Sequence, residues 1–308
     1  VFKVPVPGFI FFRLTVRFIF LLYFNFLYRD KVLEFGNYSM FPFNKGCVLV
    51  HHPYLYDDIA LKMLPHGKRI IERSKRIAFY ISSVKGGKTL VSQSVIIQGA
   101  LEKKYGAKSI IIPNPIMISS KSYINRSFVL GDTQREFSVI YASRYYPHKC
   151  HQQAIDIVER LQPFFKIRLI LTVDEASMPD ALRLSMKKPF IANVGEVGQE
   201  KLVDLYSCSD LALFPSSTET FGNTIAEKMS FSLPIVIKNA SYANAFYTKD
   251  ELQKCSFTDV EEGVNVLKNL LCNPSELVDM ARSNYEKSNK FLSIENWSRR
   301  YLKIVRDL

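Results

Sequence analysis

The chain contains 308 residues, 47% of them hydrophobic, and has a formal net charge of +12 at pH 7. One hydrophobic core seldom supports a chain of this length, so we expect two domains of roughly 130 and 170 residues. The five cysteines form an odd set without CxxC spacing, which argues against a disulfide framework and a structural zinc site. This cysteine usage favours a reducing compartment, by default the cytosol.

The charge is distributed unevenly along the chain. Residues 1–130 contain 19 Lys and Arg against 6 Asp and Glu, whereas residues 131–308 contain 22 against 23. A basic domain of this kind predicts an anionic partner, which can be an acidic membrane surface, a lipid pyrophosphate or nucleic acid. A basic surface that serves only solubility is the alternative.

The segment of residues 6–28 is rich in aromatic and aliphatic side chains and is long enough for a membrane span. Arg13 and Arg17 lie near its middle on one helical face, and each arginine at a bilayer centre costs about 2.5 to 3.5 kcal/mol. We therefore expect a helix that lies in the membrane interface or packs in the core. A signal peptide is disfavoured because no small-residue cleavage site follows. Since the chain starts with valine, we expect an N-terminal domain truncated at its start.

Residues 47–114 alternate between strand-like and helix-like stretches, which predicts a parallel sheet. The expected strands are 47–52, 76–81 and 109–114, and the expected helices are 58–64 and 93–105. His51 and His52 end the first strand and point to opposite sides, so one of them can open into a cleft between domains. We expect this residue to be His52, with a satisfied structural histidine as the alternative.

Two further stretches of the first half resemble ligand motifs but lack the required spacing. The lysine-rich residues 83–89 lack the G-x4-G-K-[ST] pattern of a phosphate loop, so we expect a flexible basic loop there. Asp57 and Asp58 are adjacent carboxylates, but no D-x-D follows a strand. We therefore expect no metal site.

A strand, a polar turn and a helix are expected over residues 139–158, which read VIYASRYYPHKCHQQAIDIV. Arg144 and Lys149 follow the strand, five positions apart across a turn that contains proline. Both can therefore point into the mouth of one parallel sheet and neutralise a diphosphate. Two ordinary surface cations are the alternative.

A second strand, loop and helix follow at residues 211–230. The helix start leaves the backbone N–H groups near Gly222 unpaired, and the helix dipole favours an anion at this end. Glu219 and Glu227 flank this position and can accept hydrogen bonds from sugar and ribose hydroxyls. Two solvated surface glutamates are the alternative.

Together these motifs resemble the retaining glycosyltransferases of family 4, which have the GT-B fold of two Rossmann-like domains facing across a cleft. The resemblance covers about residues 137–234 of the α/β pattern. It rests on S-R-x4-K at 143–149, the segment 193–197, the strand entry 209–216 and E-T-F-G-x4-E at 219–227. It implies an acceptor-binding domain over residues 1–130, a nucleotide-sugar-binding domain over 131–290, and a C-terminal helix over 291–308 that crosses back to the first domain.

The resemblance also implies roles for individual residues. In that family the Arg/Lys pair holds the donor diphosphate, the first glutamate contacts the donor sugar, and the second glutamate holds ribose hydroxyls. The catalytic candidates are therefore Arg144, Lys149 and Glu219, to which we add His52 as the expected cleft residue. The donor-binding candidates are Val194, Gly195, Val197, Thr220, Phe221, Gly222, Asn223, Thr224 and Glu227. Cys150 departs from the small or amide residue that usually follows the lysine.

The implied activity is a metal-independent, retaining hexosyl transfer that uses a nucleotide-diphosphate sugar as donor and needs no cofactor. The implied acceptor is a lipid-linked or other saccharide hydroxyl in the assembly of surface polysaccharide, such as lipopolysaccharide, O-antigen or capsule. We expect a cytoplasmic protein that is peripheral on the inner membrane face, contacts anionic lipid through residues 1–130 and has no nucleic-acid partner. A GT-B nucleotide-sugar epimerase and a non-enzymatic basic nucleic-acid-binding protein are the alternatives.

Overall fold

A computed structural model of the chain describes residues 32–34, 46–50, 53–62, 64, 66–126 and 135–307. The chain divides into two compact units: unit 1 comprises Val1–Ile112 with Ser298–Leu308, and unit 2 comprises Pro113–Trp297. The helix expected at residues 6–28 and the side chain of His52 lie outside the described residues. The functional domain boundaries at residues 130 and 290 stay predictions. None of the described helices is both long and apolar enough to cross a membrane.

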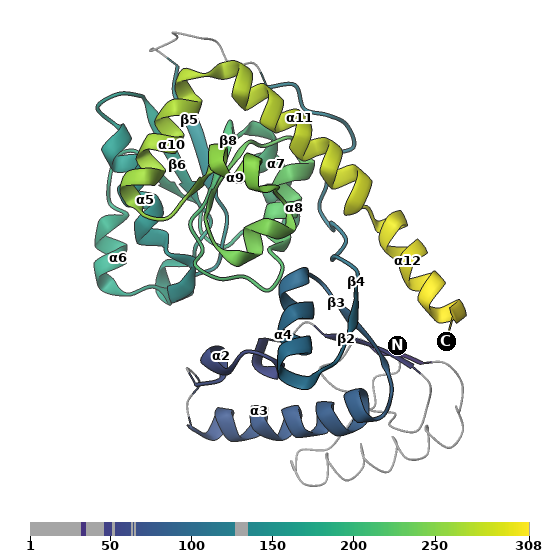
Figure 1. Cartoon of the computed structure of the whole chain (residues 1–308). Coiled ribbons are helices and arrows are strands. Elements are labelled where there is room, and N and C mark those ends of the chain that lie inside the picture. The colour runs from purple at the N-terminus through teal and green to yellow at the C-terminus, as the bar shows by residue number, and fades with distance from the viewer. Residues whose placement is uncertain are drawn as a thin grey trace. The chain divides into compact units, whose positions relative to one another are not determined.

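The described part of unit 1 forms a parallel sheet in the order β1-β2-β3-β4, flanked by helices (Figure 1). Its strands are β1 Val32–Glu34, β2 Gly46–Val50, β3 Thr89–Ser92 and β4 Ser109–Ile111. Its helices are α2 Asp58–Lys62, α3 His66–Phe79 and α4 Val95–Tyr105, with a 3-10 turn at Pro53–Leu55 and a π-helical turn at Tyr80–Lys85. The expected parallel sheet is confirmed, as are the strand that begins near residue 47 and the helix that ends at Tyr105.

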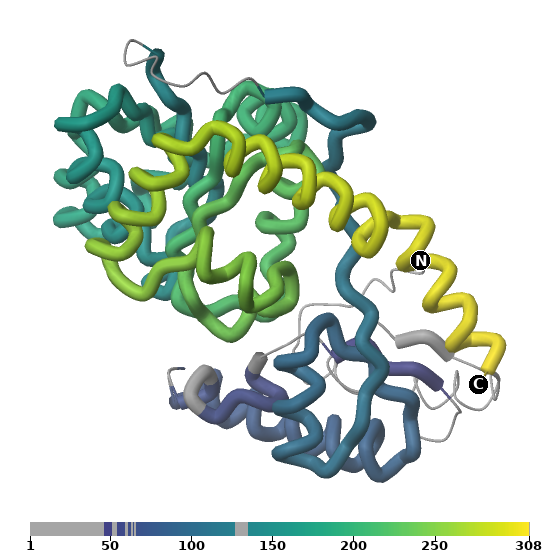
Figure 2. The backbone as a smooth tube through the Cα atoms, turned by 45° about the horizontal axis from the view of Figure 1, so that its top comes forward, coloured from purple at the N-terminus to yellow at the C-terminus, as the bar shows by residue number. Residues whose placement is uncertain are grey.

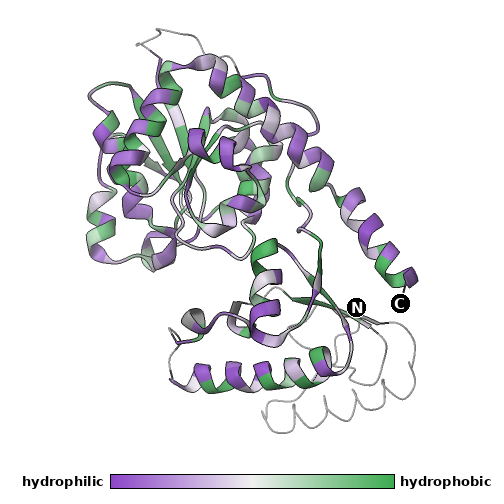
Figure 3. Ribbon diagram, in the orientation of Figure 1, coloured by the Kyte–Doolittle hydropathy of each residue, from purple (hydrophilic) through white to green (hydrophobic). Residues whose placement is uncertain are grey.

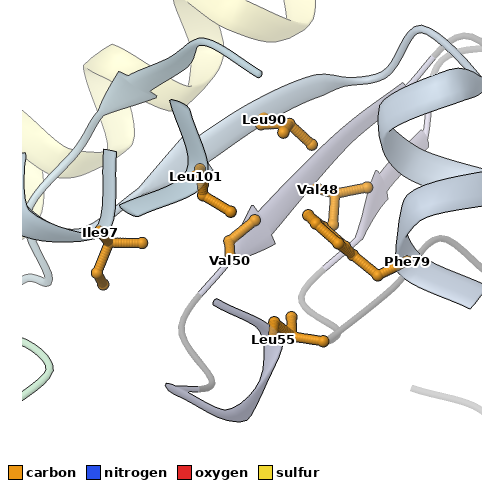
Figure 4. Packing of buried hydrophobic residues seen from close by; sticks show 7 residues of the cluster. All are labelled: Val48, Val50, Leu55, Phe79, Leu90, Ile97 and Leu101. Carbon is orange, nitrogen blue, oxygen red and sulfur yellow. The ribbon is translucent and has the colours of Figure 1, made fainter. Parts of the chain in front are cut away.

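A cluster of buried apolar side chains joins this sheet to its helices (Figure 4). Strand β2 is buried along its whole length, as expected for a strand that is covered on both faces. Helix α3 contributes one side chain, Phe79, from its C-terminal end. The cluster consists of Val48, Val50, Leu55, Phe79, Leu90, Ile97 and Leu101.

Two local expectations for unit 1 are wrong. Residues 76–81 are not a strand, because they form the end of α3 and the start of the π-helical turn. The helix is stabilised by Arg76, which donates a hydrogen bond of 2.6 Å to the carbonyl oxygen of Asp57 and forms an ion pair with Asp58. Residues 83–89 are not a free loop either, because Ser83 is fully buried and Thr89 begins β3, where it pairs with Cys47.

Unit 2 contains a parallel sheet in the order β10-β9-β8-β5-β6-β7, with helices on both sides (Figure 1). Its strands are β5 Phe137–Tyr141, β6 Ile167–Leu171, β7 Ile191–Asn193, β8 Leu211–Phe214, β9 Ile235–Lys238 and β10 Ser256–Phe257. Its helices are α5 His151–Leu161, α6 Asp180–Ser185, α7 Gln199–Cys208, α8 Asn223–Ser230, α9 Lys249–Cys255, α10 Val260–Cys272 and α11 Pro274–Phe291. This strand order is that of a doubly wound, Rossmann-like domain.

Residues 113–126 run along unit 2 without forming a helix or strand (Figure 2). The segment is held at its end by Arg126, a buried side chain whose guanidinium donates hydrogen bonds to five carbonyl oxygens. These belong to Tyr206, Ser207, Ser209, Phe231 and Ser232. Because α7 ends at Cys208 and α8 at Ser230, this one cation satisfies the carbonyl groups at the C-terminal ends of both helices.

The C-terminal helix α12 spans Ile294–Asp307, which confirms the helix expected at the end of the chain. Its residues from Ser298 onward belong to unit 1. There Arg300 donates a hydrogen bond of 2.6 Å to the carbonyl oxygen of Ile111, and Tyr301 and Ile304 are buried.

Candidate functional site

The centre of the unit 2 sheet is where its strand order reverses. From β5 the chain builds β6 and β7 on one side, and β8, β9 and β10 on the other. In open parallel sheets, ligands bind outside the carboxyl ends of the strands at such a reversal. The loops after β5 and β8 are therefore where a ligand is expected, and they contain Arg144, Lys149 and Glu219.

Lys149 and Glu219 meet across these two loops. The Lys149 Nζ and Glu219 Oε1 atoms are 2.5 Å apart, and the two side chains are 17% and 12% exposed. Lys149 ends a 3-10 turn at Pro147–Lys149, and Cys150 then takes a left-handed conformation, with φ of 52°, that leads into α5. The structure thus brings together two of the residues that the sequence identified seventy positions apart.

Two buried tyrosines hold these loops in place. The hydroxyl of Tyr141 donates a 2.6 Å hydrogen bond to the Lys149 carbonyl oxygen and lies 3.3 Å from the Ser216 hydroxyl. The hydroxyl of Tyr242 donates a 2.6 Å hydrogen bond to the carbonyl oxygen of Ser216. Burial raises the pKa of both tyrosines, so both remain neutral donors at physiological pH. The two loops that contain Lys149 and Glu219 are therefore fixed by hydrogen bonds from buried tyrosines.

Arg144 has a different environment from Lys149. It forms an ion pair with Glu196, and the two side chains are 74% and 54% exposed. Glu196 lies in the loop after β7, next to Gly195, whose N–H donates a 3.3 Å hydrogen bond to the side chain of Asn193. The segment 193–197 identified in the sequence thus lies beside Arg144, although the sequence did not identify Glu196 as the partner.

The start of α8 combines an uncapped helix end with a glycine that other residues cannot replace without strain. Gly222 has a φ of 94°, and an added Cβ would lie 2.7 Å from the Cδ1 of Ile225. No side chain caps this end, so the first N–H groups of the helix point away from it without intrahelical partners. Asn223 accepts a 2.9 Å hydrogen bond from Asn114, and Phe221 is buried against Phe246. Only the main chain of Phe221 is therefore available to a ligand.

Glu227 and Lys228 lie next to each other on α8. The Glu227 carboxylate accepts a 3.4 Å hydrogen bond from the hydroxyl of Tyr206, and burial raises the pKa of Glu227. Lys228 is completely buried, and this burial lowers the pKa of its amine to about 7, against the opposing effect of the Glu227 carboxylate. The sequence reasoning missed Lys228, although a lysine beside the apolar residues Ala226 and Met229 was a visible signal.

The remaining candidate residues differ in their exposure, and their roles stay predictions. Val194 is exposed, Val197 and Thr224 are partly exposed, and Thr220 lies in the loop that contains Glu219. His52 lies outside the described residues. Within the described ranges, no group of three or more His, Cys, Asp or Glu side chains is arranged to hold a metal ion.

In unit 1, α3 exposes several apolar side chains, while two of its arginines donate hydrogen bonds to carbonyl oxygens of the preceding segment. Ile70, Ile71 and Ile77 are 51%, 56% and 62% exposed, and apolar and polar residues alternate along the helix (Figure 3). Arg69 instead donates hydrogen bonds of 2.6 and 2.9 Å to the carbonyl oxygens of Lys62 and Leu64. Exposed apolar side chains flanked by cations, here Lys68 and Arg73, are typical of a helix that lies on a membrane surface.

The chain is similar to known proteins in sequence and in fold. Residues 136–273 match the family model described as "Glycosyl transferases group 1", and this range includes every strand of unit 2, from β5 to β10. An alpha-monoglucosyldiacylglycerol synthase of Acholeplasma laidlawii is 29% identical over 217 residues, which make up 66% of this chain and 53% of the relative. The chain thus spans about half the length of this curated relative.

Solved structures extend the likeness to both units. A glycosyltransferase from Rickettsia africae superposes with a TM-score of 0.73 at 14% identity, covering 100% of this chain and 84% of that chain. The Anabaena protein HepE, solved in complex with UDP and glucose, has a TM-score of 0.67 at 16% identity, covering 86% of this chain and 72% of that chain. The fold is GT-B. The predicted α/β fold class is confirmed, and residues 136–273 resemble the glycosyl transferases of group 1.

Proposed function

We propose that this GT-B chain transfers a sugar from a nucleotide-diphosphate donor to an acceptor hydroxyl. The observation that carries the proposal is the meeting of Lys149 and Glu219 at the strand-order reversal, beside the uncapped start of α8. A cation and a set of free N–H groups suit a diphosphate, and a carboxylate suits a sugar hydroxyl. Glu227, eight positions further along, suits the ribose hydroxyls.

The same groups provide a mechanism for the transfer. The leaving diphosphate gains negative charge as the glycosidic bond breaks, and Lys149, Arg144 and the N–H groups at Gly222 stabilise that charge. Preorganised donors of this kind contribute without being consumed, and the loss of one costs roughly 3 kcal/mol in other enzymes. The acceptor hydroxyl attacks the sugar carbon from the face that the diphosphate leaves and gives its proton to the departing diphosphate, so the configuration at the sugar carbon is retained.

We propose that this chemistry needs no divalent cation. Lys149, Arg144 and the positive end of the α8 dipole all lie at the carboxyl ends of the strands and supply positive charge there. Transfer should therefore continue at its full rate in the presence of EDTA. A rate that collapses with EDTA and returns with Mg²⁺ or Mn²⁺ would contradict this part of the proposal.

The proposed acceptor is a lipid or a lipid-linked saccharide at the inner face of the cytoplasmic membrane. Two observations support it: the outward isoleucines of α3 between cations, and the excess of 13 positive charges in residues 1–130. The name of the Acholeplasma relative points to a glycolipid product of that protein. We propose the corresponding role here, in the assembly of a glycolipid or a lipid-linked surface polysaccharide.

The test is transfer of labelled glucose from UDP-glucose into lipid by the full chain. HepE was solved with UDP and glucose, so UDP-glucose is the first donor to try, followed by GDP-, dTDP- and ADP-glucose. Vesicles of anionic phospholipid containing diacylglycerol provide the acceptor. We expect labelled lipid with the wild-type chain and none with Lys149→Met, while Lys201→Met, on the exposed surface of α7, serves as the matched control. The absence of both donor binding and transfer across the panel would overturn the proposal.

Membrane contact is tested separately by sedimentation with vesicles. We expect the wild-type chain to bind anionic vesicles more tightly than neutral ones, and the pair of changes Ile70→Ser and Ile77→Ser to weaken that binding. Leu184→Ser is the control, because Leu184 is 64% exposed on α6 of unit 2. Equal binding by the α3 variant and the wild type would exclude α3 as the contact.

A further inference from the structure

Lys228 is a buried cation without a hydrogen bond. Its side chain is 0% exposed, and no described residue accepts a hydrogen bond from its Nζ atom. The atom lies 5.5 Å from the ring centroid of Tyr206 and 5.3 Å from that of Phe214, so two aromatic rings are its close neighbours. Burying an amine in this way is costly, and the rings offset only part of the cost. The residue therefore calls for an explanation beyond stability.

The charged groups that face Lys228 all belong to the candidate site. They are Glu227 on α8, Glu219 in the loop after β8 and Lys149 in the loop after β5. Lys149 and Glu219 neutralise each other as an ion pair, which leaves Glu227 as the unbalanced carboxylate. Tyr206 of α7 connects Glu227 to Lys228, because its hydroxyl donates a hydrogen bond to the Glu227 carboxylate and its ring faces the Lys228 amine.

We propose that Lys228 is a positioning residue for the donor: its buried ammonium group keeps Glu227 in the carboxylate form that accepts hydrogen bonds from ribose hydroxyls. This inference rests on the proposed function. Lys228 does not itself touch the donor, because its amine is covered on all sides. An uncharged side chain at this position would leave Glu227 as a half-buried carboxylate without a counter-charge, and such a group takes up a proton more readily.

The same arrangement couples donor binding to the uptake of a proton by Lys228. Burial lowers the pKa of Lys228, so the amine loses its proton as the pH rises above neutrality, and the site then gains a net negative charge. An anionic donor binds better when the amine is charged. Binding at about pH 8 therefore draws a proton onto Lys228. UDP-glucose is a suitable probe because its diphosphate, esterified at both ends, does not titrate in this range.

Titration calorimetry with UDP-glucose tests the proposal in a double-mutant cycle of the full chain. We expect Lys228→Met to weaken binding about tenfold at neutral pH, the effect of one pKa unit. Glu227→Gln should also weaken binding, and in that background Lys228→Met should change the affinity little. In buffers of different ionisation enthalpy at about pH 8, the wild type should take up protons on binding and Lys228→Met should take up none.

Thermal unfolding separates this role from a structural one. Lys228→Met replaces a buried amine with an apolar side chain of similar size, so we expect a higher Tm together with the weaker donor binding. The gain in Tm should be largest below about pH 7 and should shrink as the pH rises toward about 10, because the unfolded wild type binds more protons than the folded protein in that range. Met229→Leu, a change at the next buried residue of α8, should leave donor affinity unchanged.

Failure of the inference on Lys228 can be distinguished from failure of the proposed function. If Lys228→Met binds UDP-glucose as the wild type does, or loses as much affinity in the Glu227→Gln background as alone, the inference is wrong while the proposed function stands. If the wild type binds UDP-, GDP-, dTDP- and ADP-glucose equally poorly, the proposed function is wrong and the inference falls with it.

Discussion

Two ion pairs of unit 2 take their cations from the same loop, the one after β5, yet their environments differ. The Lys149–Glu219 pair is 17% and 12% exposed, whereas the Arg144–Glu196 pair is 74% and 54% exposed. Attraction between charges is several times stronger away from water than at the surface, where solvent and salt screen it. The first pair is therefore a fixed feature of the site, and the second can exchange its partner at little cost.

This difference suggests a division of labour between the two cations. The carbonyl oxygen of Lys149 accepts a hydrogen bond from the Tyr141 hydroxyl, and its amine pairs with Glu219. Its charge is therefore preorganised where the loops meet. Arg144 is free to turn from Glu196 toward an incoming anion, because an exposed pair contributes little to stability. We expect the fixed cation to matter most for the rate of transfer and the exposed one mainly for capture of the donor.

The largest effect is expected from Lys149→Met, which removes the fixed cation. The transfer rate should fall at least about 100-fold, since one lost preorganised donor costs roughly 3 kcal/mol. Transfer of labelled glucose measures the rate, and circular dichroism checks that the fold is retained. A rate within about tenfold of the wild type would contradict the larger role that we expect for Lys149 in the rate of transfer.

Glu219→Gln should reduce stability, because it leaves the largely buried Lys149 side chain without its counter-charge. We expect the free energy of unfolding to fall by about 1–2 kcal/mol, less than for a fully buried pair. Urea unfolding measures the change, and Glu196→Gln is the matched control, for which we expect less than about 0.5 kcal/mol. Equal losses in the two variants would show that exposure does not rank these pairs.

Arg144→Gln should mainly affect the donor. We expect the KM for the donor to rise several-fold, up to about tenfold, while stability stays within about 0.5 kcal/mol of the wild type. Steady-state kinetics at varied UDP-glucose concentration measures this. If kcat fell as far as in Lys149→Met while KM stayed constant, both cations would act on the transition state in the same way.

The smallest effect concerns salt. Raising the ionic strength from about 0.1 M to about 1 M shortens the screening length from about 10 Å to about 3 Å. The coupling energy of Arg144 and Glu196, measured by a double-mutant cycle of unfolding, should fall to nothing, and that of Lys149 and Glu219 should largely persist. Equal salt sensitivity of the two couplings would contradict the comparison.

Much of the unit 2 fold could be predicted from sequence, because its information is local. The apolar runs of β5 and β8, each followed by a polar turn and a helical repeat, indicate strand, loop and helix without any long-range knowledge. The resemblance to family 4 then suggested which loops meet. The structure brings Lys149 to Glu219 as that arrangement requires, although their roles on a donor stay predictions.

The errors and omissions have a common physical origin in tertiary contacts. Residues 76–81 contain a short apolar run that fits a strand as well as a helix, and the choice depends on the partners of Arg76 in another segment. The partnership of Arg144 with Glu196 spans 52 positions, and the burial of Lys228 depends on rings from α7 and β8. No local pattern specifies such contacts.

The five carbonyl contacts of Arg126 impose an order on the assembly of the chain. Its hydrogen-bond partners lie 80 to 106 positions further along the sequence. During synthesis, Arg126 can form its full set of hydrogen bonds only after Ser232 has left the ribosome and both partner helices have formed. Unit 2 therefore cannot attach its own leading segment early, and in a nascent chain stalled before that point the Arg126 guanidinium would lack its carbonyl partners.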